Sequence, residues 1–70
     1  MRHSDFRIGM EFLMSDARWR CTDIGKRTVI AIKLNAPDVS WYNGPPYAVA
    51  ECVLDEYDLD ACEAIQHAGL

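Results

Sequence analysis

The densest group of ionisable side chains in the chain is acidic and lies in the stretch VLDEYDLDACE, from Val53 to Glu63. Carboxylates gathered in this way could ligate a divalent cation. The stretch lacks, however, the ligand spacing and the glycine of a calcium-binding hand. We therefore expect a solvated acidic segment at the start of a helix, and the sequence predicts no metal site.

Cysteine and histidine offer little further chemistry. The three cysteines, Cys21, Cys52 and Cys62, are an odd number without a CxxC pair, so we predict neither a disulfide framework nor a zinc half-site. Only Cys62 could be a reactive thiol, and the alternative is a small buried hydrophobe like the other two. His3 and His67 have no matched acid–base partner. The sequence thus predicts no catalytic residue, no cofactor-binding residue and no enzyme.

Rigid side chains are concentrated in the stretch DVSWYNGPPYAVAEC, from Asp38 to Cys52. The turn dipeptide Asn43-Gly44 is followed by two prolines, which have no N–H and restrict the residue before them. The loop should therefore be stiff, and stiff aromatic side chains can serve as binding anchors. They can equally plug the open end of a barrel, and both interpretations stay open. The candidate interaction surface comprises Trp41, Tyr42, Pro45, Pro46 and Tyr47.

Charge is distributed unevenly along the sequence. All seven basic residues lie before Asn35, where four acids leave a balance of plus three, whereas the second half carries seven acids and no lysine or arginine. A basic face for an anionic partner is one interpretation. In so small a domain the two halves must lie against each other, so self-complementarity, within one chain or between two, is the simpler interpretation. The candidate basic face comprises Arg18, Arg20, Lys26 and Arg27.

A nucleic-acid partner would require aromatic rings and basic groups on the same surface. In the stretch RWRCTDI the ring of Trp19 alternates with Arg18 and Arg20, so that the ring and the guanidinium groups point to opposite faces of a strand. The net charge of −4 also opposes binding to a polyanion. We therefore predict no nucleic-acid partner.

The spacing of apolar residues has a period of two over most of the chain, which predicts strands. The strongest alternation, over 6–14, places Phe6, Ile8, Met10, Phe12 and Met14 on one face. A turn at Ser15-Asp16 should lead to a strand over 18–24, with Trp19, Cys21 and Asp23 on one face and Trp19 in the core. The remaining expectations are a central strand over 28–34 covered on both faces, a loop over 35–46, a strand over 47–54 and a helix over 58–68 capped by Asp58.

These elements predict a mainly β fold with one short C-terminal helix. We expect one small domain over 1–70, with residues 1–5 frayed. An antiparallel, partly open barrel of the SH3-like kind accounts for three consecutive strands, a long loop, a fourth strand and a terminal helix. The close alternative is an α+β sheet with the helix across one face.

The strings FRIGMEFLMSDARWRCTDIGKRTVIAI and WYNGPPYAVAECVLDEYDLDAC resemble a set of short bacterial proteins of unassigned function. Among these are products of mobile gene cassettes carried by integrons. The resemblance covers nearly the whole chain from Phe6 to Cys62. It implies a bacterial domain spread on mobile elements, and it offers no catalytic or binding residues to carry over.

The expected function is that of a non-catalytic interaction module, which forms a homo-oligomer or docks on a protein partner. The alternative is a small-ligand-binding domain that uses the aromatic loop as one wall of a pocket. No apolar run approaches the roughly 18 residues needed to span a bilayer, and the first residues have no hydrophobic signal region. We therefore predict a cytoplasmic protein without a membrane partner.

Overall fold

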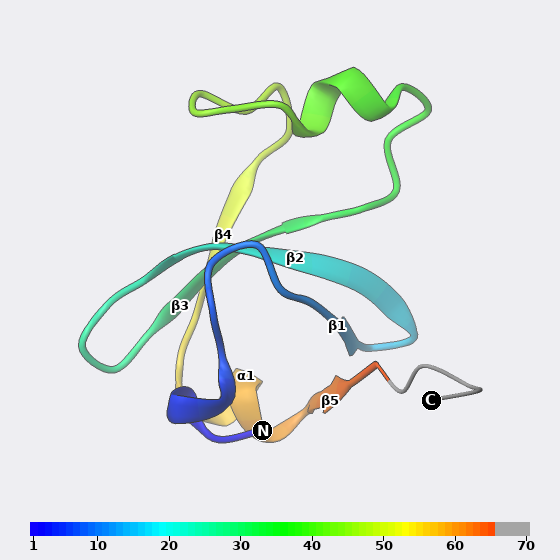
Figure 1. Cartoon of the computed structure of the whole chain (residues 1–70). Coiled ribbons are helices and arrows are strands. Elements are labelled where there is room, and N and C mark those ends of the chain that lie inside the picture. Colours follow the sequence, from blue (N-terminus) through cyan, green and yellow to red (C-terminus); the bar gives the residue numbers. More distant parts are fainter. Residues whose placement is uncertain (66–70) are drawn as a thin grey trace.

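Five antiparallel strands form one sheet in the computed structural model, which describes residues 1–65 (Figure 1). The strand order is β4-β3-β2-β1-β5, so the fifth strand returns to pair with the first and the sheet is not closed. This confirms the mainly β class, and the SH3-like type of barrel stays a prediction. The elements are a 3-10 turn η1 (His3–Asp5), β1 (Glu11–Met14), β2 (Ala17–Ile24), β3 (Val29–Lys33), a second 3-10 turn η2 (Val39–Tyr42), β4 (Glu51–Leu54), α1 (Glu56–Asp60) and β5 (Cys62–Ala64).

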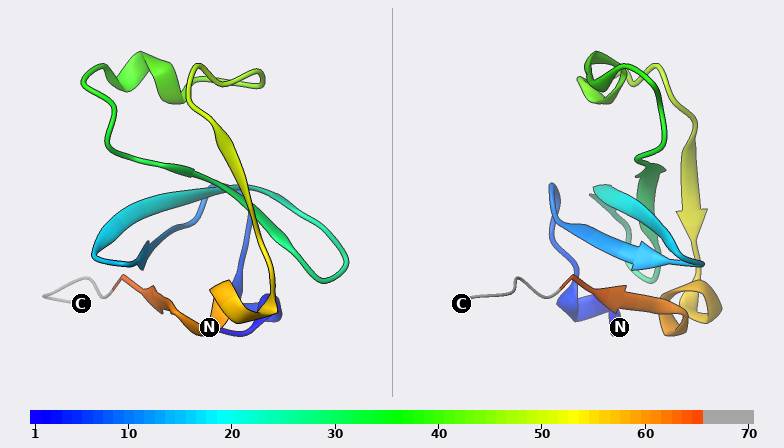
Figure 2. Two further views of the ribbon diagram at one scale, coloured as in Figure 1. Left: turned by 180° about the vertical axis from the view of Figure 1, so that it is seen from behind. Right: turned by 90° about the vertical axis from the view of Figure 1, so that its right-hand side faces the viewer.

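The sheet is curled, and its two ends differ (Figure 2). The long connection between β3 and β4 projects at one end. The N-terminal turn, α1 and β5 lie together at the other end, and α1 joins β4 to β5. Because α1 has five residues, it does not extend across a face of the sheet as the α+β alternative requires.

The first hairpin follows from local sequence. Ser15 and Asp16 both adopt positive φ angles, 52° and 61°, as a two-residue turn between twisted strands requires. This turn pairs Phe12 with Trp19 and Met14 with Ala17. The predicted turn at Ser15-Asp16 is therefore confirmed.

The second hairpin contains a bulge that the alternation rule did not predict. The register between β2 and β3 shifts between Cys21 and Asp23, so that Cys21 pairs with Ala31 but Asp23 pairs with Ile30. A bulge inserts one extra residue and thereby moves later side chains to the opposite face. The prediction that Asp23 shares a face with Cys21 is consequently wrong.

One face of the sheet, here called the inner face, carries the main core. The rings of Phe6 and Phe12 meet edge to face with their centroids 5.1 Å apart. Trp19, predicted to lie in the core, is on the face of the core but only half-buried against it, and its Nε1 donates to the Met14 carbonyl at 3.2 Å. The buried members of the core are Phe6, Phe12, Cys21, Val29, Ala31, Leu54, Leu59 and Cys62.

The strand predicted over 6–14 is shorter in the structure. A turn at Gly9, with a φ of +91°, separates Phe6 from β1 and leaves Ile8 66% exposed. Phe6 nevertheless reaches the core. The predicted central strand is confirmed as β3, in which the successive residues Ala31 and Ile32 are both fully buried although they point to opposite faces.

The last two predicted elements have different bounds. β4 begins at Glu51 rather than Tyr47, which lengthens the preceding connection. The helix is capped by Asp55, whose carboxylate accepts from Tyr57 N and Asp58 N at 3.0 Å, so the prediction that Asp58 caps it is wrong.

The helix predicted over 58–68 is also wrong beyond Asp60. There the chain turns into β5, because Cys62 packs in the core opposite Met14 and the free edge of β1 receives a strand. Residues 66–68 of that prediction, with His67, lie outside the described part.

The first five residues are not frayed as predicted. The amino group of Met1 donates to the carbonyl oxygens of Leu59 and Cys62 at 2.8 and 3.2 Å. Asp5 accepts from Arg2 N at 2.9 Å and stabilises the turn η1. The contacts of Met1 depend on residues about sixty positions away, so the local polarity of the segment could not indicate them.

Candidate functional site

The connection between β3 and β4, residues 34–50, is called the aromatic loop. Its turn η2 begins at Asp38, whose carboxylate accepts from Ser40 N at 2.9 Å. This bond and a bond from the Ser40 side chain hold the pKa of Asp38 below its usual value. Further along, Ala48 N donates to the Trp41 carbonyl at 3.2 Å and ties the two arms of the loop together.

Tyr42 anchors the aromatic loop to the second face of the sheet, here called the outer face. Its hydroxyl accepts from Ala36 N, and its ring lies 5.9 Å from the Arg20 guanidinium on β2. Arg20 pairs with Ile32, the residue that is fully buried outside the main core. The loop therefore covers part of the outer face and supplies a second, smaller packed region.

Val39 and Trp41 in η2, here called the tip of the aromatic loop, are exposed. Trp41 is 41% exposed, and Val39 is 79% exposed. Tyr47 by contrast is half-buried, and a Cβ added to Gly44 would lie 2.7 Å from its ring. The two interpretations of the loop thus apply to different residues: Tyr42 and Tyr47 pack inward, while Trp41, Pro45 and Pro46 are exposed.

The inward side of the aromatic loop forms one wall of a surface groove, the loop groove, of about 500 Å³. Its floor contains the apolar side chains of Ile30 and Val53, and Val53 is 64% exposed. Two carboxylates line it, and no basic side chain does. The lining residues are Thr22, Asp23, Ile30, Pro45, Tyr47, Glu51 and Val53.

The four residues of the candidate basic face do not form one surface. Arg18 and Arg20 lie on β2 and share Glu11, at 3.5 and 3.3 Å. Lys26 and Arg27 lie beyond the far end of β2, in the turn to β3. Arg27 Nε lies 3.1 Å from Glu56 Oε1, so a basic residue of the first half does contact the acidic second half.

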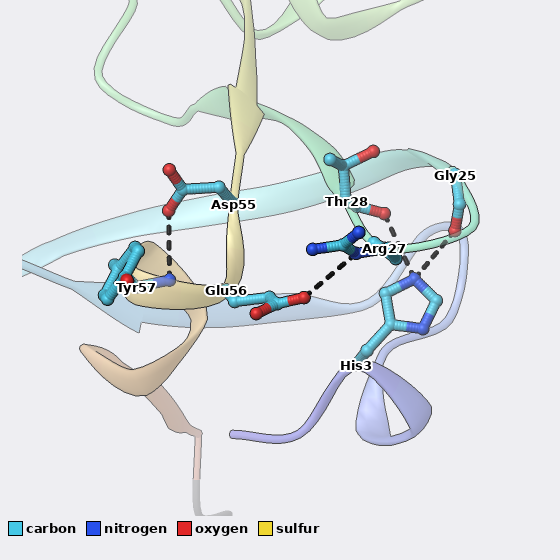
Figure 3. Close-up of polar contacts among 7 residues, drawn as sticks. All are labelled: His3, Gly25, Arg27, Thr28, Asp55, Glu56 and Tyr57. Carbon is cyan, nitrogen blue, oxygen red and sulfur yellow. Dashed lines mark hydrogen bonds and ion pairs between the residues drawn. The ribbon is translucent and has the colours of Figure 1, made fainter.

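A second pocket, the hairpin pocket, surrounds this last ion pair (Figure 3). It measures about 420 Å³ and is lined by Arg27, Thr28, Asp55, Glu56 and Tyr57. Beside it, His3 Nε2 lies 2.7 Å from the Gly25 carbonyl and 3.2 Å from the Thr28 carbonyl, so this nitrogen carries the hydrogen and donates. Sequence reasoning missed this role of His3, because its partners lie more than twenty residues away.

The cysteines are placed as small hydrophobes. Burial raises the pKa of the Cys62 thiol, which donates to the Asp58 carbonyl at 3.3 Å, and burial likewise raises the pKa of Cys21. Within residues 1–65 no group of three histidine, cysteine or acidic side chains could hold a metal ion. In that same range no helix is long and apolar enough to cross a bilayer.

Comparisons of the chain with protein-family models, with curated proteins and with solved structures gave no match. The candidate site is therefore defined by geometry alone. It consists of the exposed tip of the aromatic loop, the loop groove and the adjoining edge of β4.

Proposed function

We propose that the protein is a non-catalytic interaction module that associates with a second copy of itself, or docks on a protein partner, through the tip of the aromatic loop. The observation that carries this proposal is the exposure of Trp41 and Val39 on a loop whose other side is fixed. Aromatic side chains that are held rigidly bury a large area at low entropic cost, and such residues dominate interface energies. The cytoplasmic location and the bacterial cassette origin stay predictions.

Several contacts keep this tip rigid. Asp38 caps η2, the Tyr42 hydroxyl bonds to the Ala36 backbone, and Tyr42 lies under Arg20. A partner that covers Trp41 would therefore order little of the loop on binding. Pre-organisation of this kind favours affinity, because the conformational entropy has already been lost on folding.

Sedimentation equilibrium over a concentration series tests the self-association branch. We expect wild type to form a homodimer or larger assembly, and Trp41→Ala to lower the mass while the far-UV spectrum and melting temperature stay close to wild type. The control is Ile8→Ala, which removes an apolar side chain outside the loop that is 66% exposed, more than the 41% of Trp41. A wild type that stays monomeric at high micromolar concentration contradicts self-association, and equal effects of both variants contradict the role of Trp41.

A small-ligand-binding domain is the second candidate function. The loop groove favours it, because about 500 Å³ falls in the range of small-molecule sites and Pro45 and Tyr47 form a wall as that function requires. A thermal-shift screen of metabolites tests it. A binder should raise the melting temperature of wild type in a saturable manner and fail to do so with Tyr47→Ala. If no metabolite acts, or if Tyr47→Ala responds equally, the groove is not that site.

A further inference from the structure

β4 forms an edge of the sheet. Within residues 1–65 it pairs only with β3, from Val29 with Leu54 to Ile32 with Glu51. The backbone groups on the other side of an edge strand are free to pair with another chain. Neither proline nor lysine occurs in β4, and its register with β3 is unbroken. Its remaining protections are its length of four residues and the charge of Glu51, and a basic segment would neutralise that charge.

The outer face beside this edge has a defined chemistry. Glu51 and Val53 point to it from β4, and both are exposed. A strand added at β4 would place its own side chains directly opposite these two, at the spacing at which cross-strand pairs interact. A basic side chain is suited to the place opposite Glu51, and an apolar one to the place opposite Val53 above the floor of the loop groove.

The distribution of charge argues against a second copy of this chain as the strand that pairs with the β4 edge. Within the described residues the sheet ends in β4 and β5, and these edges carry Glu51 and Glu63. The basic strand residues are Arg18 and Arg20 on β2 and Lys33 on β3, and both strands already have partners on both sides. A pairing of two acidic edges would be repulsive, whereas a basic segment of another protein would be attracted.

We propose that the free edge of β4 accepts an extended, positively charged segment of a different protein as an added strand. Backbone hydrogen bonds to β4 hold the segment, its basic side chains lie against Glu51, and its alternate apolar side chains cover Val53. The proposal goes beyond the proposed function, which uses the tip of the aromatic loop as its contact surface. It does not depend on Trp41, which lies in η2 rather than on the sheet.

The test is an amide-shift titration of the full ¹⁵N-labelled chain with a blocked hexapeptide of alternating arginine and valine. We expect saturable shifts centred on residues 51–54, with a dissociation constant below about 1 mM. The peptide of alternating glutamate and valine should not bind. Two further peptides carry N-methyl groups at the valines or at the arginines, and each therefore lacks the N–H donors on one side of the added strand. At least one of the two should bind about tenfold more weakly than the unmodified peptide.

Two charge variants of the protein distinguish binding at the β4 edge from non-specific electrostatic attraction. Glu51→Lys should weaken binding of the basic peptide about tenfold, because it places like charges opposite each other. The matched control is Glu63→Lys, which makes the same change of charge at the opposite edge and should weaken binding less than about twofold. Both residues are exposed, so neither substitution disturbs packing.

Several outcomes would overturn the proposal. It is wrong if the basic peptide does not bind, if the two charge variants act equally, or if neither N-methylated version binds more weakly. Arginine amide binding as tightly as the hexapeptide would instead assign the loop groove to a small cation. Measurement with Trp41→Ala keeps the two proposals apart, since this variant should lose self-association and retain the peptide.

Discussion

The two faces of the sheet are both packed, but by different means, and β3 shows this within two successive residues. Ala31 on the inner face is buried among Phe12, Cys21 and Leu54, which come from three other strands. Ile32 on the outer face is equally buried. It lies next to Arg20, on the part of this face that the aromatic loop covers. The inner core depends on paired strands, whereas the outer one depends on a loop.

This difference determines what each face can do. Neighbouring strands pair over three to five residues each and so connect the members of the inner core, which we expect to unfold together. The loop contacts the outer face through few groups, chiefly Tyr42 and Tyr47, and leaves Val53 uncovered. The loop is held in one conformation by its own hydrogen bonds, but its few contacts with the sheet give its attachment a low local stability. Binding surfaces are often found in regions attached in this way. The outer face is therefore where we place the partners.

The largest expected effect compares the two packed regions directly. Phe12→Ala should destabilise the protein by about 3–5 kcal/mol, enough to unfold so small a domain, because Phe12 is fully buried and stacks edge to face on Phe6. Ile32→Ala should cost about 2–3 kcal/mol, since the covering loop can move to fill part of the space. Urea denaturation measures both values.

The matched variant Ile32→Val removes one methylene and should cost about 1 kcal/mol. If Ile32→Ala costs as much as Phe12→Ala, the outer region is as rigid as the inner one and the contrast between the faces does not hold. A cost near zero would show that the loop does not bury Ile32 in solution.

A second, smaller effect concerns the packing inside the loop. Gly44→Ala would place a Cβ 2.7 Å from the Tyr47 ring, so the ring must move. We expect a loss of about 1–3 kcal/mol. The loss should be confined to the loop, seen as faster hydrogen exchange over residues 43–48 with unchanged exchange in β1 and β2.

A double-mutant cycle tests the cause of this effect. In the Tyr47→Ala background the same substitution at Gly44 should cost almost nothing, because no ring remains to be displaced. An equal cost in both backgrounds would mean that the contact with Tyr47 is not responsible. Faster exchange in β1 and β2 would mean that the loop and the inner core unfold together.

The sequence predicted those parts of the fold in which local patterns and pairing agree. The Ser15-Asp16 turn, the pairing strand with Trp19 toward the core, and a central strand covered on both faces are all confirmed. In these regions the apolar residues recur at every second position, and this places them on the face of the sheet that packs in the core. The predictions were wrong where one residue changes the period, as at the turn on Gly9 and the bulge before Asp23.

The C-terminal prediction was wrong for a different reason. Leu59 and Cys62 have the three-residue spacing of a helix, and both are in the core, but only the first lies in α1. The same spacing fits a continuous helix and also a short helix followed by a strand. The chain takes the second form because β1 has an open edge with which Cys62–Ala64 can pair. For the site, the sequence predicted a stiff aromatic loop and its anchors. It could not predict which rings turn inward or that Asp23 and Glu51 line one groove, because both depend on tertiary pairing.

Electrostatic contacts on the two sides of the molecule should also differ in strength. Arg20 is one-third exposed, contacts Glu11 at 3.3 Å and lies over Tyr42, whereas Arg27 is 81% exposed and contacts Glu56 at 3.1 Å. Arg20→Gln should lower the free energy of unfolding by about 1 kcal/mol, and Arg27→Gln by less than about 0.5 kcal/mol, although its ion pair is the shorter.

Urea denaturation at low and high salt measures these differences. Screening should reduce the effect of Arg20→Gln only in part, because the contact with the Tyr42 ring is partly shielded from solvent. Equal effects of the two substitutions, or effects that do not change with salt, would contradict this account of the charged contacts.

The smallest expected effect is a pH dependence confined to the aromatic loop. The Ser40 backbone and side chain donate to Asp38 and lower the pKa of its carboxyl from the usual 3.8, so the charged form is favoured in the folded loop. A lowered folded pKa means that this contribution to loop stability is present above pH 3.8 and is lost as the pH falls through the folded pKa.

NMR titration should therefore give a midpoint for Asp38 below 3.8, with the Ser40 amide shift following the same curve. Asp38→Asn, which keeps an oxygen acceptor but cannot titrate, should hold η2 at neutral pH and abolish the curve at Ser40. A midpoint at or above 3.8, or a Ser40 shift that still titrates in Asp38→Asn, would show that the bond does not fix the loop in solution.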